Sequence, residues 1–123
     1  MIYDVYNALK TSSLINEKVG TRIKFYEYPP TDNMQGVYIV IDPVGSPIPK
    51  DYADNQWLTY EYLFQIEVWS LSLEDTKIIA NEIPKVLRKE LGMSQDSVGP
   101  DEWDKETNIY RDARRYVGKQ DVQ

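Results

Sequence analysis

Apolar side chains occupy every second position in one long segment of the chain, from Trp57 to Ser70. The even positions are Tyr60, Tyr62, Phe64, Ile66 and Val68. This alternation predicts a β-strand with one apolar face. Fully extended, the segment would be about 45 Å long, whereas a compact domain of this size is about 35 Å across. We therefore expect a strand that is longer than its own domain.

Two other segments have helical spacing. Residues 2–10 carry apolar side chains at the i, i+3, i+4 and i+7 positions, which predicts a short amphipathic helix. The second stripe runs from Leu73 to Leu91 through Ile79, Ala80, Ile83, Val86 and Leu87. Ser72 is placed to cap its start and Gly92 to end it. Pro84 lies inside this helix, where we expect a kink.

The remaining segments predict three further strands and two irregular stretches. We expect strands at 21–28, 37–41 and 108–118, the second of them central because it is apolar on both faces. Residues 43–56 contain three prolines, which predicts a mobile loop rather than a regular strand or helix. Residues 93–107 are polar and are expected to form turns. Residues 119–123 are expected to be a frayed tail.

These elements predict one α+β domain over residues 1–118. Its sheet would be mainly antiparallel, with about four strands and with the helices packed on one face. The expected order is helix, strand, strand, strand, helix, strand. A chain of 123 residues is long enough to bury a real hydrophobic core without staples.

Composition excludes several kinds of chemistry. The chain has no cysteine and no histidine, so disulfides, thiolate or imidazole metal ligands and serine–histidine triads are excluded. No glycine-rich phosphate loop is present. Glu61 and Glu67 would lie about 20 Å apart on one strand, too far for an acid–base pair. We therefore expect a protein that is not an enzyme and that needs no cofactor.

Charge argues against sequence-specific nucleic-acid binding, and the spacing of the carboxylates argues against a metal site. The net charge is −6, and a protein that binds duplex DNA normally presents a basic patch. Only Arg111, Arg114 and Arg115 cluster. The carboxylates of Asp101–Asp104 do not have the spacing of a calcium loop and are interpreted as a solvated turn. No apolar run approaches the roughly 20 residues of a membrane helix, so we expect no membrane partner.

Aromatic content points to an interface. Ten tyrosines and three tryptophans are many for this length, and such residues are favoured in oligomer contacts. Many of them could equally line the core. The cluster Arg114, Arg115 and Tyr116 has two interpretations as well: arginines that lie along their own sheet, or anchors of a contact between subunits.

The segment PDEWDKETNIYRDARRY, residues 100–116, resembles the C-terminal signature of a tail-completion family from siphophages of Gram-positive bacteria. The predicted order of helices and strands is also similar to that of tail terminators and head–tail joining proteins. The resemblance implies a structural protein of the virion tail, assembled in the host cytoplasm. It implies a ring, typically a hexamer, that ends the tail tube and contacts the major tail protein and the head–tail connector.

The resemblance also suggests roles for particular residues. In a ring, the overhanging strand would pair with the next subunit. The candidate subunit interface comprises Trp57, Leu63, Trp69, Arg114, Arg115 and Tyr116. The candidate lumen-facing residues are Glu61, Gln65 and Glu67, and the acidic lumen that they would form would repel DNA phosphates. The candidate assembly loop comprises Pro47, Ile48, Pro49 and Tyr52.

Three other functions stay open from the sequence. The chain could be a neck or head-completion adaptor of the same virion. It could be an interaction module unrelated to phages. It could also be a carboxylate-based, metal-dependent enzyme, although no constellation of residues favours that.

Overall fold

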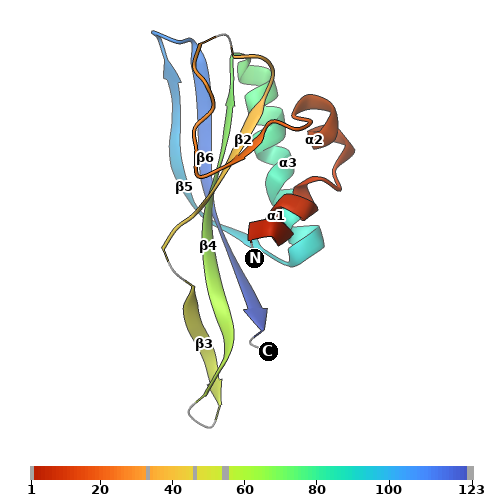
Figure 1. Ribbon diagram of the computed structural model, residues 1–123, viewed down its shortest axis with the longest axis vertical. Helices are drawn as coiled ribbons and strands as arrows, with labels where there is room; N and C mark the ends of the chain where they lie inside the picture. The colour runs from red at the N-terminus through yellow and green to blue at the C-terminus, as the bar shows by residue number, and fades with distance from the viewer. Residues whose placement is uncertain (1, 33, 46, 54–55, 122–123) are drawn as a thin grey trace.

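A six-stranded sheet forms the long axis of the molecule, and helices cover one of its faces (Figure 1). The computed structural model describes residues 2–32, 34–45, 47–53 and 56–121. Its elements, in chain order, are α1 (Ile2–Leu9), α2 (Ser13–Lys18), β1 (Ile23–Phe25), β2 (Tyr38–Pro43), β3 (Ile48–Ala53), β4 (Gln56–Ser70), α3 (Leu73–Leu91), β5 (Ser94–Asp104) and β6 (Ile109–Asp121).

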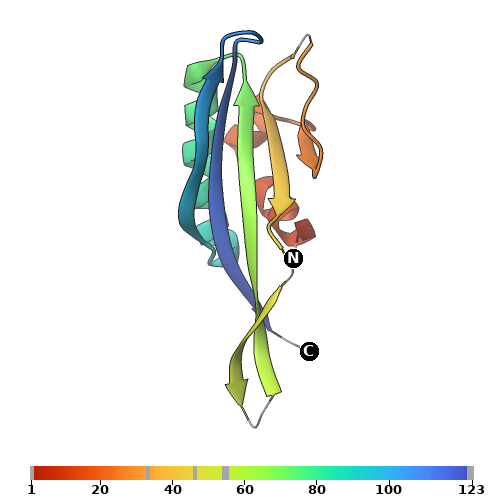
Figure 2. The ribbon, with the colours of Figure 1, turned by 90° about the vertical axis from the view of Figure 1, so that its left-hand side faces the viewer.

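The sheet has the strand order β1-β2-β4-β6-β5, with β3 paired to the free part of β4 (Figure 2). β1 and β2 run parallel, and the other described pairs are antiparallel. The expected α+β fold with a mainly antiparallel sheet is confirmed. The expectation of about four strands was too low, because β3 and β5 were not predicted.

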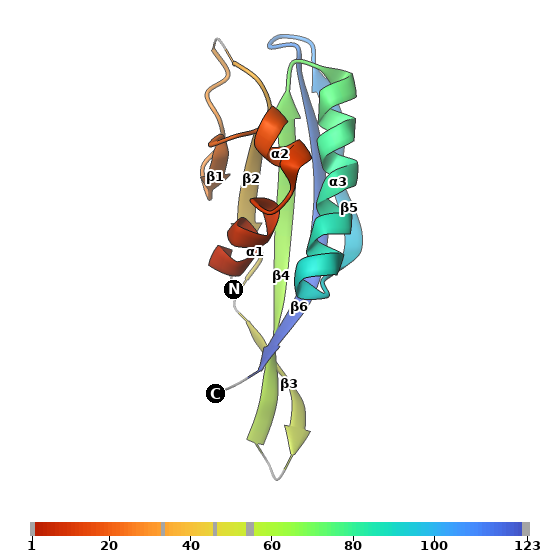
Figure 3. The ribbon, with the colours of Figure 1, turned by 90° about the vertical axis from the view of Figure 1, so that its right-hand side faces the viewer.

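The core lies between the sheet and the helices. Figure 3 shows α1, α2 and α3 in front of the sheet. Phe64, Ile66 and Val68 of β4 are each 1% exposed and pack in one cluster with residues of α1 and α3, including Leu9 and Ile83. The even positions of the long strand therefore face the helices, as predicted. We call this the inner face of the sheet and the opposite one the outer face.

The long strand is real, but its overhang is paired within the chain. β4 runs without interruption for 15 residues. Its first part pairs with β3, from Ala53↔Gln56 to Ile48↔Glu61. Thr59–Glu61 also pair with β6 on the other side. The prediction that a neighbouring subunit must satisfy this overhang is therefore wrong.

The predicted absence of regular structure in residues 43–56 is also wrong. Residues 48–53 form β3, whose only described strand partner is β4. Proline is tolerated on an edge strand, where its missing N–H need not serve a second neighbour. Pro49, which pairs with Tyr60, therefore does not prevent strand formation. The mobility expected for this segment stays a prediction.

The other corrections concern the C-terminal part. Residues 94–104 form β5 rather than turns, with irregular pairing between Gln95 and Ser97 and between Val98 and Asp101. Residues 119–121 are not a frayed tail, because they pair with Thr59–Glu61 of β4. Residues 122 and 123 lie outside the described residues.

The boundaries of α3 follow from local chemistry. The Ser72 side chain accepts a hydrogen bond from the Asp75 N–H at 3.1 Å, and Gly92 ends the helix with φ of 67°. This positive φ suits glycine, which has no Cβ. Glu74 and Asp75 lie in the first turn, and Arg88 and Lys89 in the last, where they complement the helix dipole. The helix continues through Pro84 and is not split there.

We expect the Ser72→Ala variant to lose about 1 kcal/mol of unfolding free energy, the usual effect of removing an N-cap. The loss of the bond to the Asp75 N–H is the cause. Urea denaturation followed by circular dichroism would measure it. Ser97→Ala is the matched control, since Ser97 is exposed on β5. Equal stability of the two variants would contradict the assigned cap.

Candidate assembly surface

The most prominent feature of the surface is a hairpin that projects beyond the body of the molecule. It consists of β3 and the start of β4, residues 48–53 and 56–61, and we call it the arm. Figure 1 shows it extending along the strand direction, away from the helices. The arm holds none of the described buried hydrophobic residues, and the first buried hydrophobic residue of β4 is Phe64. Its length is therefore not needed to cover the core.

Polar contacts tie the arm to the end of β6. Asp51 Oδ2 accepts hydrogen bonds from the Thr59 hydroxyl at 2.6 Å and from Lys119 Nζ at 3.0 Å. These bonds, that from Thr59 first, hold the pKa of the Asp51 carboxyl below its usual value. Asp51 has φ of 58°, an uncommon conformation for a residue other than glycine. The three strands of the arm region are thus joined by side chains as well as by the backbone ladder.

An apolar hollow of about 300 Å³ lies where the arm meets the body. Tyr62, Leu63 and Phe64 of β4 line it together with Ile2 and Tyr26. The remaining lining residues are Pro43, Gly45 and Pro47. Leu63 is half-buried here, and the Tyr26 side chain is 69% exposed at the rim. The hollow is open and apolar, and thus fits an inserted apolar side chain.

The outer face carries a buried ion pair. The Glu67 side chain is 0% exposed, and Arg111 Nε donates to its Oε1. The Trp69 indole N–H donates to the same oxygen at 3.0 Å, and the Gln65 amide donates to Oε2 at 3.0 Å. Burial would raise the pKa of the Glu67 carboxyl, but the bonds from Arg111, Gln65 and Trp69 outweigh it and leave the pKa lowered.

Aromatic rings and a second carboxylate complete this cluster. Arg111 lies over the rings of Trp69 and Tyr28, 5.5 and 5.8 Å from their centroids. Its Nη1 donates to the exposed Glu102 of β5 at 3.1 Å. The hydrogen bond that Arg111 donates to Glu67 is the largest cause of the raised pKa of Arg111. The cluster joins β4, β5, β6 and the segment that follows β1.

A second charged cluster joins the sheet to α3 on the inner face. Asp112 is 3% exposed and accepts from Arg114 Nε at 3.0 Å and from Lys77 Nζ at 2.8 Å. Lys77 also binds Asp101 of β5 at 2.7 Å. Burial would raise the pKa of the Asp112 carboxyl, but the bonds from Arg114 and Lys77 keep it lowered. These contacts fix the edge strand β5 against α3.

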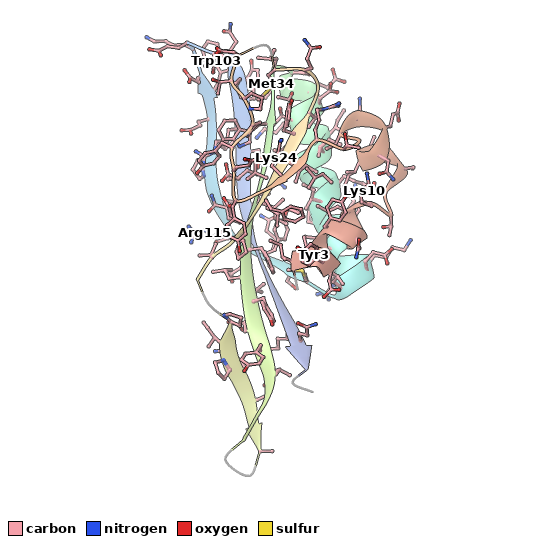
Figure 4. The ribbon with its side chains drawn as sticks, in the orientation of Figure 1. Tyr3, Lys10, Lys24, Met34, Trp103 and Arg115 are labelled. Carbon is pink, nitrogen blue, oxygen red and sulfur yellow. The ribbon has the colours of Figure 1, made fainter. Side chains whose placement is uncertain are left out.

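The predicted interface residues do not form one surface. Tyr116 is 1% exposed in the hydrophobic core, so its prediction as an interface anchor is wrong. Arg114 donates to Asn81 of α3 at 3.0 Å on the inner face. Arg115 lies on the outer face (Figure 4) and donates to Gln65 at 3.1 Å. Leu63 and Trp69 are half-buried on the outer face. The Trp57 side chain lies outside the description.

The predicted lumen residues lie on the outer face, but they do not form an acidic row. Glu67 is buried and paired, so it presents no charge to solvent. The lumen role assigned to it is therefore wrong for this folded chain. The neighbouring strand β6 places Arg115 opposite Gln65 and Lys119 opposite Glu61. These cations offset the negative charge that the β4 sequence alone suggested.

Three of the four predicted assembly-loop residues, Ile48, Pro49 and Tyr52, lie in the arm, and Pro47 directly precedes it. Ile48 is 51% exposed, Pro47 is exposed and Pro49 is half-buried. Tyr52 pairs with Trp57 through the backbone, and its side chain lies outside the description. Ile48, Pro49 and Tyr52 lie together on the projecting hairpin. Their role in assembly stays a prediction.

Sequence reasoning missed the exposed apolar side chains at the two edges of the sheet. Val98 of β5 is 73% exposed, and Trp103 is 50% exposed. At the other edge, Tyr3 and Tyr26 are 72% and 69% exposed. The presence of Val98 and Trp103 within the otherwise polar run 94–104 was the only available signal for the β5 edge. It could not be used while that run was interpreted as a turn.

The described residues lack two features that would have suggested other functions. They contain no group of three or more acidic residues placed to hold a metal ion. Among the described helices, none has the length and apolar character required to cross a membrane.

Comparison with known proteins identifies a similar fold. No protein-family model matches the sequence, and no curated protein matches it. A chain in the solved structure of the virion of a native gene transfer agent particle aligns with a TM-score of 0.66. The alignment covers 96% of this chain and 92% of the other, at 16% identity. A second solved structure aligns at 14% identity with a TM-score of only 0.44 and carries no argument. The chain thus shares its fold with a chain of that virion structure.

Proposed function

We propose that this protein is a structural component of a tailed virion, a tail-completion or tail-terminator protein that forms a ring at the head-proximal end of the tail tube. The observation that carries the proposal is the fold shared over 96% of the chain with a chain from a virion structure. The siphophage-like segment at residues 100–116 supports the same assignment. In this role the ring stops growth of the tube and presents a surface for joining the head.

The arm supports a role in assembly. It projects along the strands and its described part contributes nothing to the described core, so its length has no purpose within one folded chain. In a ring whose axis runs along the strands, the arm would reach an adjacent layer of the particle. The partners that fit this position are the major tail protein and the head–tail connector.

The charged clusters support a structural rather than a catalytic role. Glu67–Arg111 and Asp112–Lys77 join strands to each other and to α3. Both carboxylates have lowered pKa values, whereas a general base poised near neutral pH needs a raised one. We propose that the protein works without catalysis and without a cofactor.

Deletion of the gene from the genome that encodes this chain would test the proposal. We expect lysates to contain overlong tails without heads, because no ring stops tube growth. Electron microscopy would measure tail length and head attachment, and expression of the chain in trans should restore both.

Other outcomes separate the alternatives. Tails of normal length that remain unattached would identify a neck or head-completion adaptor instead of a terminator. Intact, infectious particles would overturn a virion role and favour an interaction module unrelated to tail assembly.

A further inference from the structure

Two opposite edges of the sheet carry complementary surfaces. The β1 edge comprises Arg22–Tyr26 with the neighbouring Tyr3, and the β5 edge comprises Ser94–Asp104. Figure 3 shows β1 and β5 at opposite sides of the molecule, as the strand order requires. From this arrangement we propose that the β5 edge of one copy docks on the β1 edge of the next, and that this contact closes the ring. The inference rests on the proposed function and names the subunit contact within it.

The two edges have opposite charge. Residues 94–104 include four carboxylates and no Lys or Arg, whereas residues 22–26 include Arg22 and Lys24 and no carboxylate. Lys24 is paired with Glu27 just beyond this segment, with Nζ and Oε1 3.6 Å apart, so the positive charge of the β1 edge rests on Arg22. Lys77 and Arg111 neutralise two of the β5 carboxylates, Asp101 and Glu102. The other two, Asp96 and Asp104, have no cation partner among the described residues. The guanidinium of Arg22 donates to the backbone carbonyls of Lys18 and Val37 and keeps its charge uncompensated.

Apolar side chains stand out on both edges. Val98 projects from the β5 edge with 73% of its surface exposed, the largest exposure among the described large hydrophobic residues. At the β1 edge, Tyr3 and Tyr26 are exposed, and Tyr26 forms part of the rim of the 300 Å³ hollow. A contact that inserts Val98 beside Tyr26 would bury apolar surface on both partners, which is the main driving force of association.

The register of the sheet places these side chains at the same height. Val98 pairs with Arg114, and Arg114 pairs with Ile66. Ile66 pairs with Ile41, and Ile41 with Phe25, the neighbour of Tyr26. A rotation about an axis parallel to the strands preserves height. It therefore brings Val98 of one copy level with Tyr26 of the next, as a closed head-to-tail ring requires.

The β5 edge is suited to side-chain contact rather than to a shared backbone ladder. Its pairing is irregular on both sides of Ser97–Val98, and Pro100 cannot donate from the backbone. Both features prevent indiscriminate edge-to-edge pairing. Lys77 holds the edge in place from α3, so the docking surface is ordered before the partner arrives. The occupant that fits is a second copy of this chain.

Cysteine cross-linking within assembled particles would test this contact, because the natural chain has no cysteine. The genome that encodes the chain would carry Tyr26→Cys and Val98→Cys together, and particles would be treated with a short bismaleimide. We expect a ladder of covalent multimers in the double variant. Either single variant alone should give only monomer, since each contact uses one residue from each edge.

Two further variants test the energetics. In particles without introduced cysteines, Val98→Lys should reduce incorporation of the chain, measured by quantitative blotting, at least about tenfold, the effect of losing about 1.4 kcal/mol. Leu71→Lys is the matched control, because Leu71 is also an exposed apolar residue, at 49%, but lies between β4 and α3. Leu71→Lys should leave the amount of the chain in particles unchanged.

Three outcomes would overturn the inference. Dimers from Val98→Cys alone would show a symmetric contact of two β5 edges. Particles that contain the double variant but give no multimers would place the subunit contact elsewhere and leave the proposed function intact. Absence of the natural chain from purified particles would overturn the proposed function and this inference with it.

Discussion

Replacing Glu67 with alanine is expected to lower the free energy of unfolding by about 3 kcal/mol, the lower end of the range for breaking a buried ion pair. Glu67 is 0% exposed and accepts from Arg111, Gln65 and Trp69. Its removal leaves three donors on the outer face without their acceptor. The loss stays at the lower end because Arg111 is 22% exposed and retains Glu102. Urea denaturation would measure it.

Glu102→Ala is the matched control, since it removes the other carboxylate that contacts the same guanidinium. Glu102 is 59% exposed, and exposed ion pairs contribute between about 0 and 1 kcal/mol. Its loss should therefore be several times smaller than that of Glu67→Ala. Equal losses in the two variants would show that burial of Glu67 does not set the strength of the interaction.

The pH dependence of stability provides a second measurement of the contribution of Glu67. The pKa of Glu67 is lower in the folded chain than in the unfolded one, where glutamate titrates near about 4.3. Its contribution is therefore complete above that pH and is lost as the pH falls through the folded pKa. The stability difference between the natural chain and Glu67→Gln should shrink in acid. A difference that stays constant would contradict the assigned ionisation.

Most of the fold prediction came from the alternation along β4, because apolar side chains at every second position of a strand share one face. Phe64, Ile66 and Val68 had to face the helices wherever the other strands lay. The partners of the odd positions could not be predicted in the same way. Glu67 looked like a solvent-facing charge, but Arg111, 44 residues further along the chain, covers it. Such a pair depends on strand order, which local patterns do not contain.

The two missed strands are edge strands. Ten of the eleven residues of β5 are exposed, so no buried face imposes an alternating pattern, and pairing with β6 alone defines the strand. β3 contains Pro49 and follows two further prolines, Pro43 and Pro47. Prolines normally indicate a loop, and only the pairing with β4 makes an extended conformation stable there.

The candidate assembly surface shows the same difference between features that local sequence determines and features that depend on the arrangement of distant elements. The candidate assembly-loop residues, from Pro47 to Tyr52, could be grouped from the sequence because they are neighbours in it. Tyr116 was misassigned because β6 changes its surroundings along its length. At Asp112 the inner face meets Lys77 of α3, whereas at Tyr116 it meets the hydrophobic core. The alternation of side chains along a strand assigns both residues to one face but cannot distinguish these two environments.

Excision of the arm is expected to abolish assembly while preserving the fold. The variant replaces residues 49–60 with Asn-Gly, so that a two-residue turn joins Ile48 to Glu61. These two residues already pair, and Asn-Gly is the preferred sequence for such a turn. Incorporation into particles should fall by more than about tenfold, equivalent to over 1.4 kcal/mol of binding. Quantitative blotting of purified particles would measure it.

The fold should survive because the described core lies outside the excised segment. Phe64 is the first core residue of β4, and β6 loses only its pairing at Thr59 and Tyr60 and the exposed bond from Lys119 to Asp51. Thermal unfolding of the purified variant should therefore remain cooperative. Leu71→Lys, which keeps the full length of the arm and lies outside it between β4 and α3, is the control and should assemble normally. If the shortened chain still completes tails, the partner contacts lie on the body, since the arm is then dispensable. A folded variant that fails to assemble would instead establish that the strand is long because its far end binds a partner in the particle.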